Sequence, residues 1–210
     1  MNDPQRDDAV LFDLLSGLLD SWSLWNDIAG SASTGRAWRD EYLAVTYAAG
    51  DYQPYESLVA DAARRQGLDP LLAAELTARW DELAPWPEAP AVVAAIAQTA
   101  PVGVVTNCSE DLGRRAAARV GAAFDVIVTA ESAGAYKPRP EPYQRAIGQL
   151  GLPADNVLFV AGSRYDVAGA AGSAASHRAM HRGGPRDGIR GESPSDASRR
   201  TTGRDRGAAG

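Results

Sequence analysis

The 210-residue chain has very few of the residues on which common hydrolytic and metal chemistry depends. It has one cysteine, Cys108, so it can form no internal disulfide and no cysteine-based zinc site. Both histidines, His177 and His181, lie near the C-terminal end, which leaves residues 1–172 without an imidazole. Ser-His-Asp and Cys-His mechanisms are therefore unavailable to the main body of the chain.

Long apolar runs are also lacking. No segment reaches the roughly 18–20 consecutive apolar residues of a membrane span, and the polar N-terminus does not resemble a signal peptide. The formal net charge is −6, and residues 173–210 carry 8 arginines against 4 acidic residues, a charge of +4 that leaves −10 for residues 1–172. An acidic body argues against nucleic acid or an anionic membrane surface as a partner. We therefore expect a soluble cytoplasmic protein.

Residues 173–210 form an unusual C-terminal tail. They contain 8 arginines and 7 glycines, and Met180 and Ile189 are their only large aliphatic residues. So little apolar surface cannot offset the conformational entropy that ordering would cost, so we expect the tail to be disordered. Two origins fit the composition: a natural basic tail, or replacement of a final strand and helix, for example by a change of reading frame. The abrupt change at Gly172 favours replacement.

Short apolar runs alternate with helical patterns along most of the chain. The runs typical of buried strands are residues 9–13, 102–106, 126–129 and 157–161, and the later helical patterns are residues 91–99, 110–120 and 140–150. This alternation predicts the α/β class, with a doubly wound parallel sheet.

One long helical stretch interrupts the alternation. Between Asp20 and Leu83, four successive helical patterns follow one another without a strand, and Pro85, Pro87 and Pro90 then indicate a linker. We therefore predict a core formed by residues 9–19 and 88–172, a four-helix cap over residues 20–87, and a tail over residues 173–210.

Polar side chains stand at or just after the ends of the predicted strands. Asp13 ends the first strand, Thr106 and Asn107 end the second, and Asp166 follows the last. Because the carboxyl ends of parallel strands meet at one edge of a sheet, these side chains are expected to converge, together with Lys137. Two acids, a hydroxyl–amide pair and a lysine favour an enzyme whose nucleophile is a carboxylate.

Several short segments, taken in order, are similar to a known enzyme superfamily. They are Phe12-Asp13, Leu18-Leu19-Asp20, Trp38-Arg39, Leu83-Ala84-Pro85-Trp86, Val105-Thr106-Asn107, Tyr136-Lys137-Pro138 and the stretch from Phe159 to Asp166. Over residues 9–172 the chain resembles the haloacid dehalogenase superfamily, and its L-2-haloacid dehalogenase branch in particular. The resemblance implies a Rossmann-like core with a helical cap. It also implies cofactor-free hydrolysis of the carbon–halogen bond of small 2-haloalkanoic acids through an aspartyl ester, and a homodimer.

The resemblance further implies a role for each site residue. Asp13 would be the nucleophile, Lys137 would keep it ionised, and Arg39 would receive the departing halide. Asp166 would anchor Lys137 or position the hydrolytic water. The residues implied to bind or surround the substrate are Thr106, Asn107, Ser16, Leu15, Leu43, Tyr143, Ser163 and Tyr165. Each has an ordinary alternative: strand-end capping for the hydroxyl–amide pair, and core packing for the apolar and aromatic side chains.

Two positions differ from the phosphatases of the same superfamily. Those enzymes carry a second aspartate two residues after the nucleophile, which protonates a poor leaving group, and this chain has Leu15 there. A halide leaves as a stable anion and needs no proton. The phosphatases also place an acid at the position of Gly162, which leaves Asp13 and Asp166 as the only acids for Mg²⁺. No metal is therefore expected, and Mg²⁺ is implied only if the chain is a phosphatase.

The chain also departs from the dehalogenase branch. The branch has Gly-Thr where this chain has Ser16-Gly17, so a hydrogen bond to the nucleophile is either lost or rebuilt by Ser16. Ala161 and Ser163 replace the usual serine and asparagine near the last acid. The preferred interpretation is a dehalogenase, and the alternatives are a Mg²⁺-dependent phosphatase and a catalytically lapsed protein of the same fold.

Overall fold

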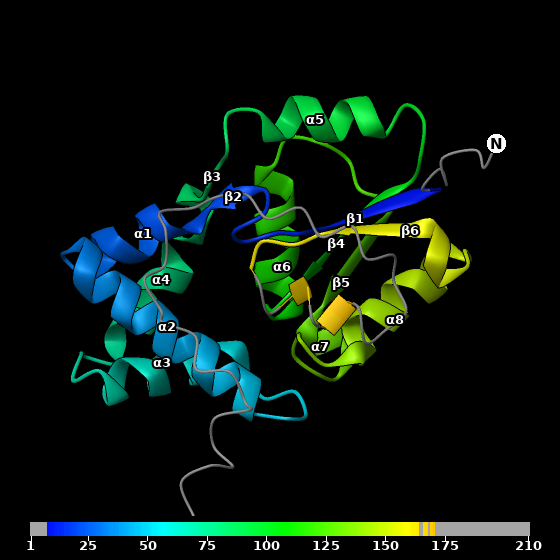
Figure 1. Ribbon diagram of the computed structural model, residues 1–210. Coiled ribbons are helices and arrows are strands. Elements are labelled where there is room, and N and C mark those ends of the chain that lie inside the picture. Colours follow the sequence, from blue (N-terminus) through cyan, green and yellow to red (C-terminus); the bar gives the residue numbers. More distant parts are fainter. Residues whose placement is uncertain (1–7, 164–165, 168, 171–210) are drawn as a thin grey trace, which may run out of the picture.

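The computed structural model shows a parallel sheet with helices on both faces and a helical bundle beside it (Figure 1). The described residues are 8–163, 166–167 and 169–170. The strands of the sheet are, in spatial order, β5 (Val126–Thr129), β4 (Val102–Thr106), β1 (Ala9–Asp13) and β6 (Val157–Val160). The predicted tail and Tyr165 lie outside the described residues.

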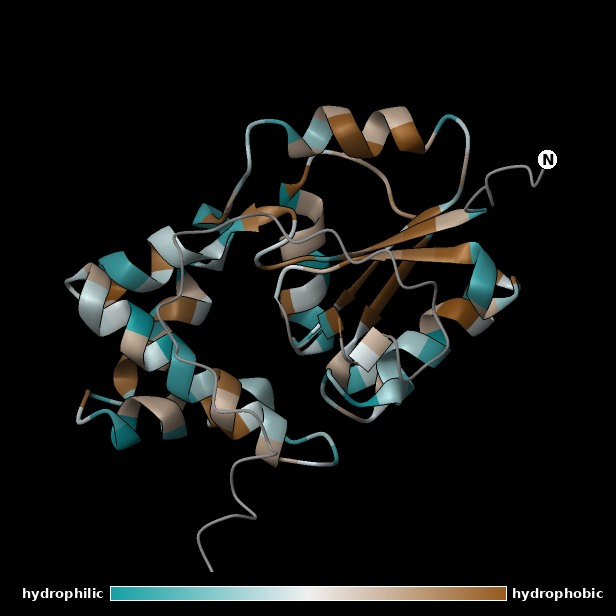
Figure 2. Ribbon diagram, in the orientation of Figure 1, coloured by the Kyte–Doolittle hydropathy of each residue, from teal (hydrophilic) through white to brown (hydrophobic). Residues whose placement is uncertain are grey.

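Successive side chains of each strand enter two different cores. In β1, Val10 and Phe12 pack in a cluster that includes residues of α5 (Ala89–Ile96) and α6 (Glu110–Arg119). Ala9 and Leu11 pack on the other face, against α8 (Pro140–Leu150). Strands buried on both faces need apolar residues at successive positions. Figure 2 shows the strands mainly in brown, the colour of hydrophobic residues, whereas the helices have both hydrophobic and hydrophilic residues. The predicted α/β class with a doubly wound parallel sheet is confirmed.

The register of the sheet brings the ends of three strands together. Asp13 at the end of β1 pairs with Val105 of β4, and Phe12 pairs with Val160 of β6. The order of the strands reverses at β1, because the chain continues to β4 and β5 on one side and returns to β6 on the other. Open parallel sheets bind ligands at the carboxyl ends of their strands, at such a reversal.

Four helices follow β1 and precede α5, as the sequence predicts. They are α1 (Ser21–Ile28), α2 (Ala32–Ala48), α3 (Tyr55–Arg65) and α4 (Leu71–Ala78), and we call them the cap. The Asp20 and Ser31 side chains cap α1 and α2 by accepting hydrogen bonds from backbone N–H groups. A short antiparallel pair, β2 (Leu19–Asp20) and β3 (Ala84–Pro85), joins the two ends of the cap. The exact domain boundaries stay a prediction.

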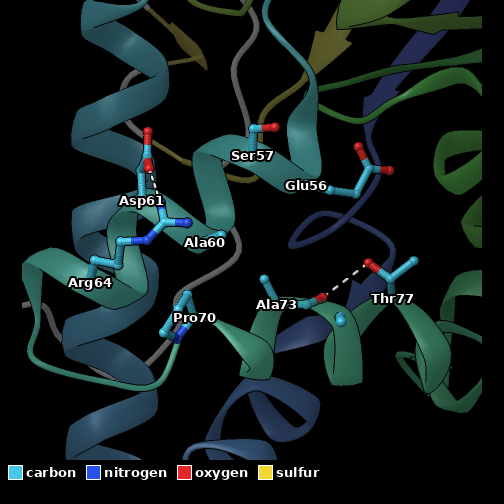
Figure 3. Close-up of a pocket in the computed structure, with 9 residues that line it drawn as sticks. Glu56, Ser57, Ala60, Asp61, Arg64, Pro70, Ala73 and Thr77 are labelled. Carbon is cyan, nitrogen blue, oxygen red and sulfur yellow. Dashed lines mark hydrogen bonds and ion pairs between the residues drawn. The ribbon is translucent and has the colours of Figure 1, made fainter.

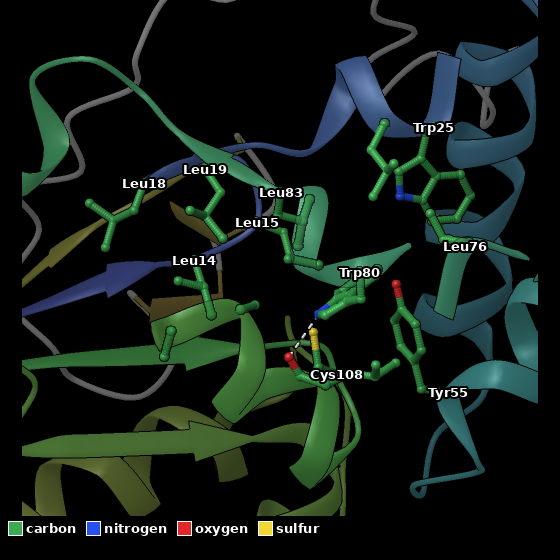
Figure 4. Close-up of a cluster of buried hydrophobic side chains, with 14 of the residues drawn as sticks. Leu14, Leu15, Leu18, Leu19, Trp25, Tyr55, Leu76, Trp80, Leu83 and Cys108 are labelled. Atoms are coloured by element: carbon green, nitrogen blue, oxygen red, sulfur yellow. Dashed lines mark hydrogen bonds between the residues drawn. The ribbon is translucent and has the colours of Figure 1, made fainter. Parts of the chain in front are cut away.

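An aromatic cluster forms the interior of the cap. The ring centroids of Trp25 and Trp38 are 4.5 Å apart, those of Tyr42 and Tyr55 are 5.2 Å apart, and those of Tyr55 and Trp80 are 5.9 Å apart. Figure 4 shows how this cluster continues into the leucines that follow β1. Trp80, in the short helix η1 (Trp80–Glu82), also donates a hydrogen bond to the carbonyl of Leu112 in α6, at 2.8 Å. The cap and the core therefore share one hydrophobic cluster.

Some predicted bounds were wrong by a few residues. Helix α5 begins at Ala89 rather than at residue 91, so Pro90 belongs to its first turn, where proline is well tolerated, and not to a linker. Strand β6 ends at Val160 rather than at residue 161. The pair β2–β3, the short helix α7 (Ala130–Ala133) and the turn η2 (Ala154–Asn156) were not predicted. Within the described residues, no helix has the length and apolarity to cross a membrane.

Candidate active site

The Asp13 carboxylate is held by the turn that follows β1. Its Oδ2 atom accepts hydrogen bonds from the Ser16 hydroxyl at 2.8 Å, the Ser16 backbone N–H at 3.1 Å and the Gly17 backbone N–H at 3.0 Å. Gly17 permits this turn because a Cβ atom there would lie 2.3 Å from the Asp13 carbonyl oxygen. The sequence, with Ser16-Gly17 where the branch has Gly-Thr, left open whether a hydroxyl group still donates a hydrogen bond to Asp13. The Ser16 hydroxyl makes this hydrogen bond.

Lys137 joins the two acids predicted for the site. Its Nζ lies 2.7 Å from Asp13 Oδ1 and 3.0 Å from Asp166 Oδ1, and the residue is only 2% exposed. Three charged groups therefore lie together at the carboxyl ends of β1 and β6, in a site largely closed to water. The structure brings together the nucleophile, lysine and second acid that the sequence predicts, although the role of each stays a prediction.

Asn107 holds the backbone of Lys137 in place. Its Nδ2 donates to the Lys137 carbonyl at 3.1 Å, and its Oδ1 accepts from the Lys137 N–H at 2.7 Å. The side-chain amide is therefore engaged on both of its polar atoms with the backbone of Lys137. Thr106 is buried, and its hydroxyl lies 3.3 Å from the Cys108 sulfur. Substrate binding by this hydroxyl–amide pair stays a prediction.

The electrostatic environment gives the two carboxyl groups different properties. Burial alone would raise the pKa of Asp13, but Lys137 and the Ser16 donors bring that pKa below its ordinary value. Burial and the neighbouring Asp13 charge raise the pKa of Asp166 above its ordinary value, despite Lys137. Burial opposes the positive charge of Lys137, but the two carboxylates raise its pKa overall. Asp13 is thus ionised beside a protonated lysine, and Asp166 is the stronger base of the two carboxylates.

Two predicted residues surround Asp166. The Ser163 hydroxyl donates to Asp166 Oδ2 at 3.1 Å, and the Tyr143 hydroxyl donates to Asp166 Oδ1 at 3.3 Å. Burial raises the pKa of Tyr143, so this phenol remains a proton donor at neutral pH. Asp166 therefore has a fixed orientation, with Lys137 on the side that faces Asp13.

Arg39 is the charged residue that the cap contributes. It lies on α2, is 5% exposed, and has its guanidinium carbon 3.7 Å from the centroid of the Trp22 ring. No carboxylate of the described residues forms an ion pair with it. Burial lowers its pKa, and among the neighbouring charges that oppose this Asp13 acts most strongly. Arg39 is therefore a buried cation that lies on the Trp22 ring and is influenced by the charge of Asp13, and its predicted role as halide acceptor stays a prediction.

The apolar residues predicted near the site lie beside these charges. Leu15 is buried and Leu43 is half-buried, and both pack in the cluster shared by the cap and the core. Their predicted role as the apolar wall of the site stays a prediction. Low access to water strengthens the electrostatic interactions of a carboxylate nucleophile.

An open groove of about 670 Å³ lies elsewhere, between α3 and α4 (Figure 3). The polar residues that line it include Glu56, Asp61, Arg64 and Thr77. Two of them, Asp61 and Arg64, form an ion pair with each other. None of the charged residues around Asp13 lines this groove, so its size is no indication of the reaction site.

Three residues near the site were not singled out from the sequence as its members. Trp22 carries the Arg39 guanidinium on its ring, and the Tyr42 hydroxyl donates to the Asn107 carbonyl at 2.9 Å. The sequence shows that both residues are aromatic, but it does not show which side chains or carbonyl groups they contact. Gly162 was noted only as the position of a missing acid. A Cβ atom there would lie 2.0 Å from Asp13 Oδ2, so the backbone approaches the nucleophile at a distance that only glycine allows.

The residues of this site do not fit a Mg²⁺ ion. The Lys137 ammonium lies between the two carboxylates that would have to bind it, and Gly162 supplies no third carboxylate. Within the described part of the chain, no group of three or more acidic, histidine or cysteine side chains is placed to hold a metal. Mg²⁺ prefers several oxygen ligands in octahedral geometry, and a buried ammonium would repel it.

Comparisons with known proteins identify the family to which the chain is similar. A family model of haloacid dehalogenase-like hydrolases matches residues 8–173. The (S)-2-haloacid dehalogenase of Xanthobacter autotrophicus is 26% identical over 181 residues, covering 77% of this chain and 70% of that protein. Haloacetate dehalogenase H-2 of Moraxella sp. (strain B) is also 26% identical, covering 78% and 80%. The structure of the L-2-haloacid dehalogenase of Xanthobacter autotrophicus superimposes with a TM-score of 0.70 at 25% identity, covering 80% of this chain and 75% of that one.

Proposed function

Because the chain belongs to the haloacid dehalogenase-like hydrolase family, we propose that it cleaves the carbon–halogen bond of small 2-halocarboxylates. The observation that carries this proposal is the buried Asp13–Lys137–Asp166 group together with Arg39. Displacement of a halide needs an ionised nucleophile on one side of the carbon and an acceptor for the anion on the other. The core supplies the first requirement and the cap supplies the second.

In the first step, we expect Asp13 Oδ1 to be the attacking atom. Oδ2 accepts three hydrogen bonds, whereas Oδ1 accepts one, from Lys137. Oδ1 therefore keeps an electron pair for the substrate carbon. A carbon–oxygen bond forms as the carbon–halogen bond breaks, and the halide leaves with the bonding electrons toward Arg39. The product of this step is an ester of Asp13.

In the second step, water attacks the carbonyl carbon of that ester. Its carbonyl oxygen is then Oδ2, which becomes negatively charged as the tetrahedral intermediate forms. The two backbone N–H groups and the Ser16 hydroxyl already donate to this atom, as in an oxyanion hole. Asp166, with its raised pKa, accepts a proton from the water. Collapse of the intermediate breaks the bond between the Asp13 carboxyl carbon and the substrate oxygen, which takes the proton of the added hydroxyl group. This releases the 2-hydroxy acid and restores the Asp13 carboxylate, and Asp166 gives its proton to solvent.

This proposal accounts for Leu15 and Gly162 better than a phosphatase does. Leu15 cannot protonate a leaving alkoxide, and a halide does not require a proton. The site has no room for a carboxylate at residue 162 while Asp13 keeps its hydrogen bonds to Ser16 and Gly17. Recognition of the substrate carboxylate by Thr106 and Asn107, the homodimer and the cytoplasmic location stay predictions.

Halide release from L-2-chloropropionate, measured with EDTA present, tests the proposal. We expect release by the wild type and none by Asp13→Asn, which keeps the shape of the side chain but removes its charge. Asp27→Asn, an exposed acid on α1, is the matched control and should behave as the wild type. A single turnover in H₂¹⁸O should place the label in Asp13 and not in the product. A folded wild type that releases no halide would favour the lapsed protein, and activity that EDTA abolishes would contradict the metal-free mechanism.

A further inference from the structure

Tyr55 has a buried hydroxyl group for which the described residues provide no hydrogen-bond partner. It is the first residue of α3 and is 1% exposed. A buried hydroxyl that has lost its water and gained no acceptor is destabilising, so an unpaired one in an otherwise packed interior calls for an explanation. Burial raises the pKa of Tyr55 well above its ordinary value, so the group remains a proton donor.

The Tyr55 ring is fixed between two other aromatic rings. It packs edge-on against Tyr42, at an interplanar angle of 68°, and against Trp80, at 72°. Figure 4 shows its hydroxyl directed toward the side of the cluster where Trp25 lies. The hydroxyl therefore cannot turn to the protein surface to recover water.

The Tyr55 ring packs against the part of α2 that carries Arg39: its centroid lies 5.2 Å from that of Tyr42, which follows Arg39 by three residues on the same helix. Arg39 is a charge that lowers the pKa of Tyr55, against the effect of burial. Among the groups that raise the pKa of Arg39, Tyr55 comes second after Asp13. Two buried groups that can donate hydrogen bonds, the neutral Tyr55 hydroxyl and the charged Arg39 guanidinium, thus lie on the neighbouring helices α3 and α2, and the Tyr55 hydroxyl has no acceptor among the described residues. Such a pair is complementary to a small anion.

Other buried tyrosines close to the site do not have this property. The Tyr42 hydroxyl donates to the Asn107 carbonyl at 2.9 Å, and the Tyr136 hydroxyl donates to the Gln53 carbonyl at 2.7 Å. Both hydroxyl groups are therefore already used in hydrogen bonds within the fold. The Trp25 indole N–H also lacks an acceptor within the described residues, and its ring centroid lies 5.5 Å from that of Tyr42. It is the rival donor in the same cluster.

We propose that the Tyr55 hydroxyl is a second hydrogen-bond donor to the departing halide, beside Arg39, and that it favours small, charge-dense halides as leaving groups. This inference rests on the proposed function. As the carbon–halogen bond breaks, the electron pair leaves with the halide, and Tyr55 donates a hydrogen bond while keeping its proton. A hydrogen bond to an anion strengthens as the charge becomes more concentrated, so chloride gains more from Tyr55 than bromide does.

Tyr55→Phe removes the oxygen and keeps the ring, so it isolates the hydroxyl. We expect the ratio of kcat/KM for L-2-chloropropionate to that for L-2-bromopropionate to fall at least tenfold in this variant, a change of about 1.4 kcal/mol. The control is Tyr136→Phe, which removes a hydroxyl that is already paired and should leave the ratio unchanged. An unchanged ratio in active Tyr55→Phe would overturn the proposal, and so would a change of equal size in the control.

A binding measurement separates this inference from the proposed function. Chloride binding to the resting protein can be followed by tryptophan fluorescence, since four tryptophans lie in or beside the cap. We expect Tyr55→Phe to bind chloride at least tenfold more weakly while its melting temperature is kept or raised, because no hydrogen bond is lost. If the wild type releases no halide but this difference in binding holds, the anion site stands and the dehalogenase proposal fails. If binding is unchanged in Tyr55→Phe but lost in Trp25→Phe, the donor is Trp25 and the inference is wrong.

Discussion

Lys137→Met tests whether the charges of the site are organised around one buried cation. The lysine lies 2.7 Å from one carboxylate and 3.0 Å from the other, with almost no contact to solvent. Methionine has a similar length and no charge, so the substitution would leave Asp13 and Asp166 buried, close together and without their cation. Removing one partner of a buried charged group costs about 3–5 kcal/mol. Since a domain of this size is stable by roughly 5–15 kcal/mol, the loss would be a large share of the total.

The size of this loss should depend on pH. Lys137 now lowers the pKa of each carboxyl group, so both pKa values rise in the variant. A carboxyl whose folded pKa is raised destabilises the protein above that pKa, and the penalty disappears as the pH falls and the group becomes protonated. In the wild type, Asp13 has a depressed pKa and stabilises the fold above its ordinary pKa, and this stabilisation is lost as the pH falls. The difference between the two proteins should therefore be largest near pH 7 and shrink toward pH 4.5.

Urea unfolding followed by circular dichroism, at pH 7 and pH 4.5, measures both effects. Lys137→Met combined with Asp166→Asn leaves a single buried carboxylate and should regain part of the stability. Arg139→Met is the control, because this arginine pairs with Asp51 and Glu141 at the surface and its loss should change little. A loss below about 1 kcal/mol for Lys137→Met, or one independent of pH, would refute the view that Lys137 neutralises two buried carboxylates.

Three further predictions concern the nucleophile. Gly162→Ala should lower kcat at least ~100-fold, because its Cβ would lie 2.0 Å from Asp13 Oδ2 and displace that oxygen from its donors; a kcat near that of the wild type would contradict this. Ser16→Ala should lower the rate of ester hydrolysis roughly 10- to 100-fold, since one of three donors to Oδ2 is lost, and burst kinetics would show accumulation of the ester. Because its partners raise the pKa of Lys137 above its ordinary 10.5, kcat/KM should stay level from pH 8 to pH 10; a decline with an apparent pKa of 8–9 would argue against a protonated lysine.

The sequence was a good guide to the sheet and a weaker one to the short elements. Strands buried on both faces need several apolar residues in a row, and the runs in β1, β4, β5 and β6 are bounded by polar residues or turns. The two-residue strands β2 and β3 have no such pattern, because their pairing is imposed by the meeting of the two ends of the cap. Pro90 looked like a linker residue, but its position in the first turn of α5 depends on where the chain leaves β3, which the sequence alone does not define.

For the candidate site too, the sequence located some features and not others. Residues placed by the ends of strands, such as Asp13 and Asp166, could be located from the sequence because topology brings those ends together. The partners of a side chain could not be located in this way. Nothing in the sequence indicated that the amide of Asn107 binds the backbone of Lys137, a loop residue 30 positions away. Tyr55 was one of several aromatic residues with helical spacing, and only three-dimensional packing shows that its hydroxyl lacks an acceptor.

Gly162 and Lys137 together explain why one substitution should not convert this site into a metal-dependent phosphatase. A carboxylate at residue 162 would meet Asp13 Oδ2 before it could reach a cation, because even a Cβ atom lies too close. If Asp13 moved to make room, it would lose its donors from Ser16 and Gly17, which fix the orientation of the nucleophile. Lys137 would still occupy the space between the two acids, where a divalent cation would have to lie. The missing side chain at residue 162 and the buried lysine are therefore coupled features, and a change of chemistry would require both to change together with Leu15.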